Sequence, residues 1–89
     1  MAKIRIPTPL RAYTAENEYV TVGGVTVGEA LKDLTTQHPA LEPHLFKDGT
    51  LRSFVNVFLE DEDVRYLDGV DTAISDNSKL MIIPSIAGG

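Results

Sequence analysis

The sequence predicts an α+β domain in which one main helix packs on one face of a mixed sheet of four to five strands. Short apolar segments with period-two alternation occur near the start, in the middle and near the end of the chain. Between them lies a single segment with helical periodicity and a capping signal. The 89 residues have room for one domain. Because one helix covers only one sheet face, the other face must meet water or a partner.

The first two strands are expected near the N-terminus. Residues 3–6 alternate charged and aliphatic side chains, and Pro7 and Pro9 end that segment. Residues 18–22 are rich in β-forming side chains and are followed by two glycines. The intervening residues 8–17 are expected to connect the two strands as a wide hairpin.

The main helix is the strongest local signal in the chain. Thr26 and Glu29 fit a capping box, in which the threonine hydroxyl accepts from the Glu29 backbone N–H and the glutamate side chain reaches back. Pro39 is expected to end the helix, because the residue before a proline avoids the α region. Four apolar residues with helical spacing then line one face and point to the core: Val27, Ala30, Leu31 and Leu34.

A loop with one short turn is expected over residues 40–50, with Leu41 and Leu45 held against the body of the domain. Residues 54–59 form the strongest predicted strand, because aliphatic and aromatic side chains follow one another without interruption by glycine or proline.

The last third of the chain is predicted to return to the sheet. The acidic residues 60–63 form a turn that leads to a short strand at residues 64–66. Residues 70–74 fit either a strand remnant or a helical turn. The final strand covers residues 79–83 and ends at Pro84.

Alternation divides these last strands into an inner and an outer face. We assign to the core the faces that carry neither asparagine nor lysine: Val55, Val57, Leu59, Leu80 and Ile82. The outer face then keeps three apolar residues: Phe58, Met81 and Ile83. If contiguous, they form an exposed apolar patch of the kind that binds partners. Alternatively, they are simply half-buried sheet residues.

Composition and charge exclude several function classes. The chain has no cysteine, which rules out disulfides, thiolate chemistry and cysteine metal sites. A net charge of -5 with scattered basic residues argues against nucleic acid and favours a basic protein partner. No apolar run is long enough to cross a membrane and no signal peptide begins the chain, so a cytoplasmic location is expected. The acidic run 60–63 and the two histidines, His38 and His44, show no metal-ligand spacing.

The candidate reactive group is the carboxylate of the C-terminal Gly88-Gly89. Two glycines form a narrow segment that fits a slot too tight for any Cβ atom. A carboxylate is a poor electrophile, and it reacts only after a partner converts it, at the cost of ATP, to an acyl-adenylate that a nucleophile attacks. The alternative is an inert, frayed terminus.

Four segments carry a resemblance to a known family: residues 6–11, 54–57, 60–65 and 84–89. Together they resemble the ubiquitin-like sulfur carriers of the MoaD/ThiS type, which serve molybdopterin, thiamine and cysteine biosynthesis. Within that family the chain most resembles the thiocarboxylate carrier of the actinobacterial cysteine pathway. The resemblance implies a β-grasp (ubiquitin-like) domain over residues 1–84 and a flexible Gly-Gly tail over residues 85–89.

The resemblance also implies a chemistry and a set of partners. An E1-like activating enzyme that uses ATP and Mg adenylates Gly89, and sulfur then replaces one carboxylate oxygen to give a thiocarboxylate. Gly88 gives the tail passage into partner sites. A PLP-dependent cysteine synthase, or a molybdopterin or thiazole synthase subunit, receives the sulfur, and in the cysteine branch a metalloprotease releases the product. The chain itself is then a protein co-substrate that binds no cofactor.

The same resemblance places the docking surface for the activating enzyme on the apolar patch, with Ile86 and Ala87 of the tail as further contacts. The uncharged residues before Gly88 favour the sulfur-carrier branch over modifiers conjugated to lysines, which often carry arginine there. Two other functions stay open: a ubiquitin-like modifier conjugated through Gly89, and a non-covalent ubiquitin-fold interaction module.

Overall fold

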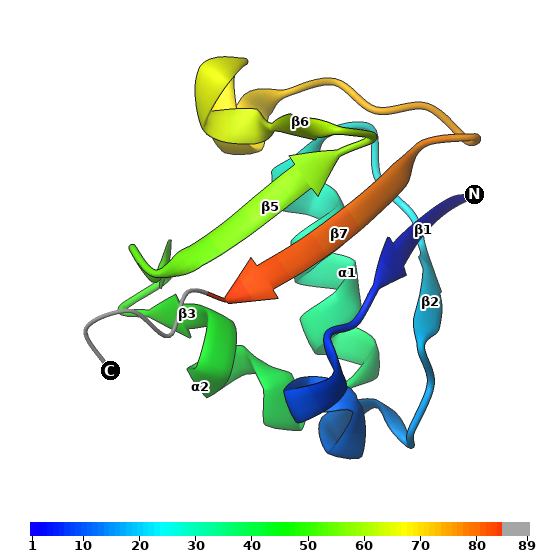
Figure 1. Cartoon of the computed structure of the whole chain (residues 1–89), viewed down its shortest axis with the longest axis vertical. Coiled ribbons are helices and arrows are strands. Elements are labelled where there is room, and N and C mark those ends of the chain that lie inside the picture. Colours follow the sequence, from blue (N-terminus) through cyan, green and yellow to red (C-terminus); the bar gives the residue numbers. More distant parts are fainter. Residues whose placement is uncertain (85–89) are drawn as a thin grey trace.

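The structure, a computed structural model, describes residues 1–84 and confirms the predicted mixed sheet with one main helix (Figure 1). The five strands of the sheet lie in the order β2-β1-β7-β5-β6. Their bounds are β1 Ala2–Arg5, β2 Tyr19–Val22, β5 Val55–Leu59, β6 Glu62–Asp63 and β7 Lys79–Pro84. The helix α1, Val27–Gln37, crosses behind the sheet as Figure 1 is drawn, so that the opposite face is open.

The last strand lies in the middle of the sheet. β7 pairs in parallel with β1, where Ile4 is opposite Leu80, and antiparallel with β5, where Val57 is opposite Ile82. The remaining pairs, β1 with β2 and β5 with β6, are antiparallel. The predicted end of the last strand is one residue early, because Pro84 still lies opposite Val55. Pro84 has no backbone N–H, so the ladder loses only one donor, at the last position of the strand.

The start of α1 confirms one half of the capping box and corrects the other. The Thr26 hydroxyl accepts from the Glu29 backbone N–H at 3.2 Å, as expected. The Glu29 carboxylate, however, accepts from the backbone N–H of Val25 at 2.9 Å, one residue before the cap. Thr26 instead forms an isolated antiparallel bridge with Ala73, which ties the start of the helix to the segment that precedes β7.

The core lies between α1 and the inner face of the sheet. All four residues of the predicted helical stripe are fully buried, and they meet the buried residues Val55, Val57, Leu80 and Ile82 of the central strands. Burying one such aliphatic side chain stabilises the fold by about 1.5–3 kcal/mol. Leu59, expected in the core, is only partly buried and packs at its margin.

The loop between α1 and β5 contains more structure than the sequence predicted. A 3-10 turn, η2 (Pro39–Leu41), and the short helix α2 (Glu42–Leu45) bury the expected Leu41 and Leu45. A two-stranded hairpin of β3 (Phe46–Lys47) and β4 (Thr50–Leu51) then follows. Asp48 and Gly49 turn this hairpin with φ values of 55° and 79°, the left-handed conformation that an Asp-Gly pair adopts readily.

Three 3-10 helices complete the fold: η1 (Thr8–Thr14), η3 (Val64–Tyr66) and η4 (Gly69–Asp71). η1 forms most of the wide connection between β1 and β2. The predicted short strand at residues 64–66 is wrong, because the paired strand β6 comes two residues earlier and residues 64–66 are η3. The Asp63 side chain causes this change, since it accepts from the Arg65 backbone N–H at 2.9 Å and caps η3. Both structures open for residues 70–74 are present in part: the helical turn is η4, and Ala73 forms the isolated β-bridge with Thr26.

Candidate functional site

The predicted reactive residues lie beyond the described part of the chain. Gly88 and Gly89, and the predicted contacts Ile86 and Ala87, all fall within residues 85–89. β7 ends at Pro84, so five residues separate the end of the central strand from the predicted reactive carbonyl. The described part of the site is therefore the sheet face that leads to this point.

The three residues of the predicted apolar patch lie on one face. Phe58 is opposite Met81 across the β5–β7 pair, and Ile83 is opposite Asn56 in the same pair. Their inward neighbours in β7, Leu80 and Ile82, are buried, so all three patch residues point away from α1. Phe58 and Met81 are half-buried, and Ile83 is 40% exposed. The patch is thus contiguous across the two central strands.

A cluster of two arginines and one glutamate borders this patch, and the sequence did not indicate it. Arg5 lies opposite Met81 on the outer face, and its Nε is 3.2 Å from the Glu18 carboxylate. Arg11 of η1 approaches the same carboxylate oxygen at 3.7 Å and donates from Nε to the Ile6 carbonyl at 2.9 Å. The outward position of Arg5 follows from strand alternation, but the approach of Arg11 depends on the path of η1.

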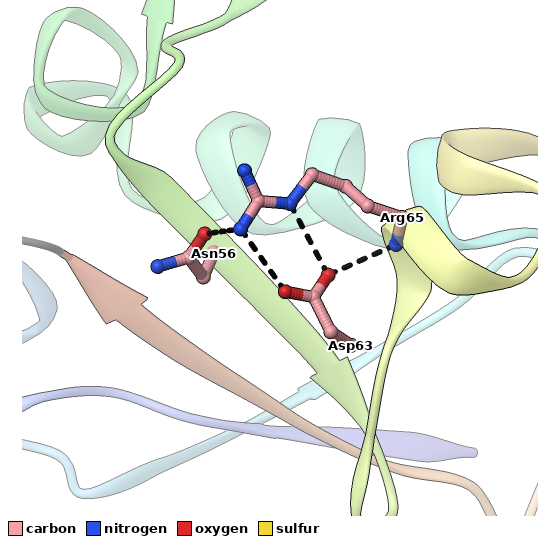
Figure 2. Close-up of polar contacts among 3 residues, drawn as sticks. All are labelled: Asn56, Asp63 and Arg65. Carbon is pink, nitrogen blue, oxygen red and sulfur yellow. Dashed lines mark hydrogen bonds and ion pairs between the residues drawn. The ribbon is translucent and has the colours of Figure 1, made fainter.

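A second polar cluster borders the patch on the β6 side (Figure 2). Arg65 reaches from η3 across the open face, with its Nη2 3.1 Å from Asp63 Oδ2 and hydrogen-bonded to Asn56 Oδ1. Asp63 lies opposite Phe58 in the β5–β6 pair. The guanidinium group is therefore held beside the patch by two partners from neighbouring strands.

The Arg65 side-chain hydrogen bond, together with its backbone hydrogen bond, lowers the pKa of Asp63 below its ordinary range. The folded chain therefore binds fewer protons at Asp63 than the unfolded chain. The resulting stabilisation is complete above the ordinary pKa of aspartate, and it is lost as the pH falls through the lower, folded-state pKa. We expect Arg65→Met to raise the Asp63 pKa towards its ordinary value, which an NMR titration of the side-chain carboxyl measures. An unchanged pKa would contradict this assignment.

Three further observations concern residues 1–84. Within this range no three His, Cys, Asp or Glu side chains are close enough together to hold a metal ion. His44 stacks on Tyr13 with ring centroids 4.3 Å apart, which joins α2 to η1. In the same part of the chain, no helix has the length and apolar character that crossing a membrane requires.

Comparison with known proteins points to one family. A model described as the ThiS family matches residues 4–89. The sulfur carrier protein CysO of Mycobacterium tuberculosis is 37% identical over 89 residues, which cover 97% of this chain and 96% of that protein. The small archaeal modifier protein 3 of Haloferax volcanii is 36% identical over 64 residues, or 72% of this chain and 70% of that protein.

The fold is matched as completely as the sequence. One chain of the crystal structure of the Amycolatopsis orientalis BexX/CysO complex superposes with a TM-score of 0.90 and 36% identity, covering 100% of both chains. The β-grasp fold that the resemblance implied is thereby confirmed. With a family model that spans residues 4–89 and relatives matched over nearly their full length, this chain belongs to the ThiS family of ubiquitin-like sulfur carriers, which act as protein co-substrates.

Proposed function

We propose that this carrier works through the carboxylate of Gly89, which is adenylated, converted to a thiocarboxylate and used as the sulfur donor in cysteine biosynthesis. The observation that carries the pathway is the 37% identity to the sulfur carrier CysO over 97% of this chain. Sulfur delivery to molybdopterin or thiamine synthesis is the alternative within the same family.

The proposed chemistry balances without any oxidant. A Gly89 carboxylate oxygen attacks the α-phosphorus of ATP, and pyrophosphate leaves. A nucleophile with sulfur at the oxidation level of sulfide then attacks the activated carbonyl and displaces AMP. One carbon–oxygen bond is thereby exchanged for a carbon–sulfur bond. ATP and Mg belong to the E1-like adenylating enzyme, and PLP, where it is used, belongs to the enzyme that accepts the sulfur.

The described residues support separate roles for the sheet face, which binds the partner, and for the tail, which carries the reactive group. The central strand β7 carries Met81 and Ile83 on the open face and leads directly into the sequence Ser85 to Gly89. A partner that covers the patch therefore meets the start of the tail. Gly88 adds no side chain, which suits passage through a narrow channel, and the uncharged Ile86 and Ala87 suit contacts with an apolar entrance.

Three partner classes follow from this proposal. The first is the adenylating enzyme, which also directs the sulfur transfer. The second is a PLP-dependent cysteine synthase, or a molybdopterin or thiazole synthase subunit in the alternative pathways. The third is a metalloprotease that separates newly made cysteine from the carrier. Since all of them act on the same terminus, we propose that they use the tail in succession.

The proposal is tested by intact-mass measurement after incubation with ATP, a sulfide source and the adenylating enzyme. We expect a mass gain that matches the replacement of one oxygen by sulfur, located at Gly89 by fragmentation. Omission of ATP is the control and should leave the mass unchanged. A chain that stays at its original mass with the complete mixture would contradict the proposal.

A second candidate function is conjugation to lysines, which the 36% identity to the small archaeal modifier protein 3 favours. In that case the adenylated Gly89 is attacked by a lysine amine instead of a sulfur nucleophile. Incubation of the tagged chain with ATP and cell extract distinguishes the two. Covalent ladders that contain a Gly89–lysine amide would support the modifier, and a thiocarboxylate on the free chain would support sulfur delivery.

A further inference from the structure

The open face carries a different charge balance from the rest of the chain. Although the net charge is -5, five of the eight basic residues lie on or beside this face: Lys3, Arg5, Arg11, Arg65 and Lys79. The acidic residues are divided between the two sides: Glu29, Asp33, Glu42, Asp68 and Asp71 lie on α1, on α2 and near η4, whereas Glu18, Glu60, Asp61 and Asp63 border the open face. The net charge is therefore a poor guide to the partner that covers this face, and the local charges must be considered.

One local feature of this face is a groove where β7 ends. It has a volume of about 350 Å³ and is lined on its polar side by Arg5 and Arg11. Its apolar side is formed by Pro7, Met81 and Ile83, so it continues directly into the apolar patch. We call this feature the arginine groove.

The arginine groove has an excess of positive charge. Glu18 is the carboxylate that both guanidinium groups approach, at 3.2 Å from Arg5 Nε and 3.7 Å from Arg11 Nη2. One negative charge is thus shared between two positive charges. The Arg11 side chain is only 23% exposed and is held by the Ile6 carbonyl, so its orientation is set before any partner arrives. A pre-organised guanidinium suits the planar geometry of a carboxylate.

We propose that the arginine groove binds a carboxylate side chain of the adenylating enzyme, next to an apolar side chain of that enzyme that covers Met81 and Ile83. This inference rests on the proposed function. The partner surface is accordingly acidic and apolar at this point, the opposite of the basic surface that the net charge favoured. On the other side of the patch, the Arg65 guanidinium beside Phe58 adds no excess charge, because Asp63 pairs with it at 3.1 Å.

The sharpest test compares two variants that each remove one negative charge, at positions two residues apart. Glu18→Gln frees both arginines of the groove, whereas Glu16→Gln removes the same charge at a residue that takes part in none of the ion pairs described for residues 1–84. We expect Glu18→Gln to bind the adenylating enzyme about two- to threefold more tightly and Glu16→Gln to match the wild type. Weaker binding by Glu18→Gln would show that the groove meets a basic group, and would overturn the proposal.

Arg5→Glu has the opposite effect on the charge of the groove, because it replaces a positive charge by a negative one. Its matched control is Lys47→Glu on β3, on another part of the surface. We expect Arg5→Glu to weaken binding about tenfold, since it places like charges against each other, and Lys47→Glu to change it less than about twofold. Arg5→Lys keeps the charge and should restore most of the affinity. Isothermal titration calorimetry gives the dissociation constants, and circular dichroism with a thermal melt confirms that each variant is folded.

Salt dependence separates an ionic contact from a purely apolar one. Binding of the wild type should weaken as sodium chloride rises, and Arg5→Glu should lose or reverse that dependence, because salt screens the repulsion between like charges. A wild-type dissociation constant that does not respond to salt would overturn the proposal. The proposal would also be overturned if the free chain self-associates and Arg5→Glu abolishes that self-association, because the groove would then bind a second copy of the chain.

The failure of this inference is distinguishable from failure of the proposed function. The enzyme used is the one that forms a thiocarboxylate on the wild-type chain, as judged by mass. If no thiocarboxylate forms, the proposed function fails. If it forms and Arg5→Glu is processed with an unchanged KM and an unchanged response to salt, the proposed function stands and the arginine groove has no such role.

Discussion

A chain that lacks Gly88 and Gly89 is expected to gain no sulfur in the complete adenylation mixture. The new terminus at Ala87 carries a side chain, and it lies two residues closer to the end of β7 at Pro84. Two residues of extended chain correspond to about 7 Å of reach. A reactive carbonyl displaced by that distance cannot meet the α-phosphate of ATP in an enzyme that holds the carrier by its sheet face. Intact-mass measurement checks the outcome.

The matched control for this truncation is Ser85→Ala, which changes the same tail without altering its length or its glycines. It should form the thiocarboxylate at a rate close to that of the wild type. Both variants should show the unchanged thermal unfolding of the domain, because the core lies within residues 1–84. If the truncated chain still acquires sulfur, the reactive carbonyl is not that of Gly89, and the proposed mechanism is wrong.

The second large effect is expected from Ile83→Asp. Ile83 is 40% exposed on the docking face near the end of β7, so the change costs the fold little but sets a carboxylate against an apolar partner. We expect the KM of the adenylating enzyme for the carrier to rise by about tenfold or more, because an unpaired charge at an interface costs several kcal/mol. Steady-state measurement of pyrophosphate release gives KM and kcat.

Val70→Asp is the matched control for that change. Val70 is 42% exposed, nearly the same as Ile83, but it lies on η4 against Gly28 of α1, on the helix side of the sheet. It should lower stability to a similar degree and leave KM near the wild-type value. Equal effects of the two variants on KM would indicate that both act through stability, and the patch would then be an ordinary half-buried surface.

The local elements of the fold were predictable because their signals lie within a few residues. The stripe that includes Leu31 and Leu34 has a period that only a helix satisfies, and all of its members are buried. Alternation, together with the rule that the core face carries neither asparagine nor lysine, assigned Val57 and Ile82 to the core and Phe58 and Ile83 to the outer face. The hairpin of β3 and β4 was missed although Asp48-Gly49 indicates such a turn, because strands of two residues show no alternation.

Some parts of the candidate site were likewise predictable from the sequence and others were not. Its reactive group and apolar patch were predicted, since a Gly-Gly ending and strand alternation are properties of adjacent residues. The polar clusters that border the patch were not. Arg11 reaches Glu18 only through the path of η1, and Arg65 reaches Asn56 only because η3 turns its side chain back across β5.

The sequence by itself determined the main helix, the four longer strands, the sides of the central strands that face the core and the proposed reactive end of the chain. Each of these depends on spacing along the backbone, which folding does not alter. Only the tertiary structure decided where the charges gather. The five basic residues of the open face come from segments between residues 3 and 79, and the charge of a surface depends on distances through space. A chain with a net charge of -5 can therefore present a groove with excess positive charge.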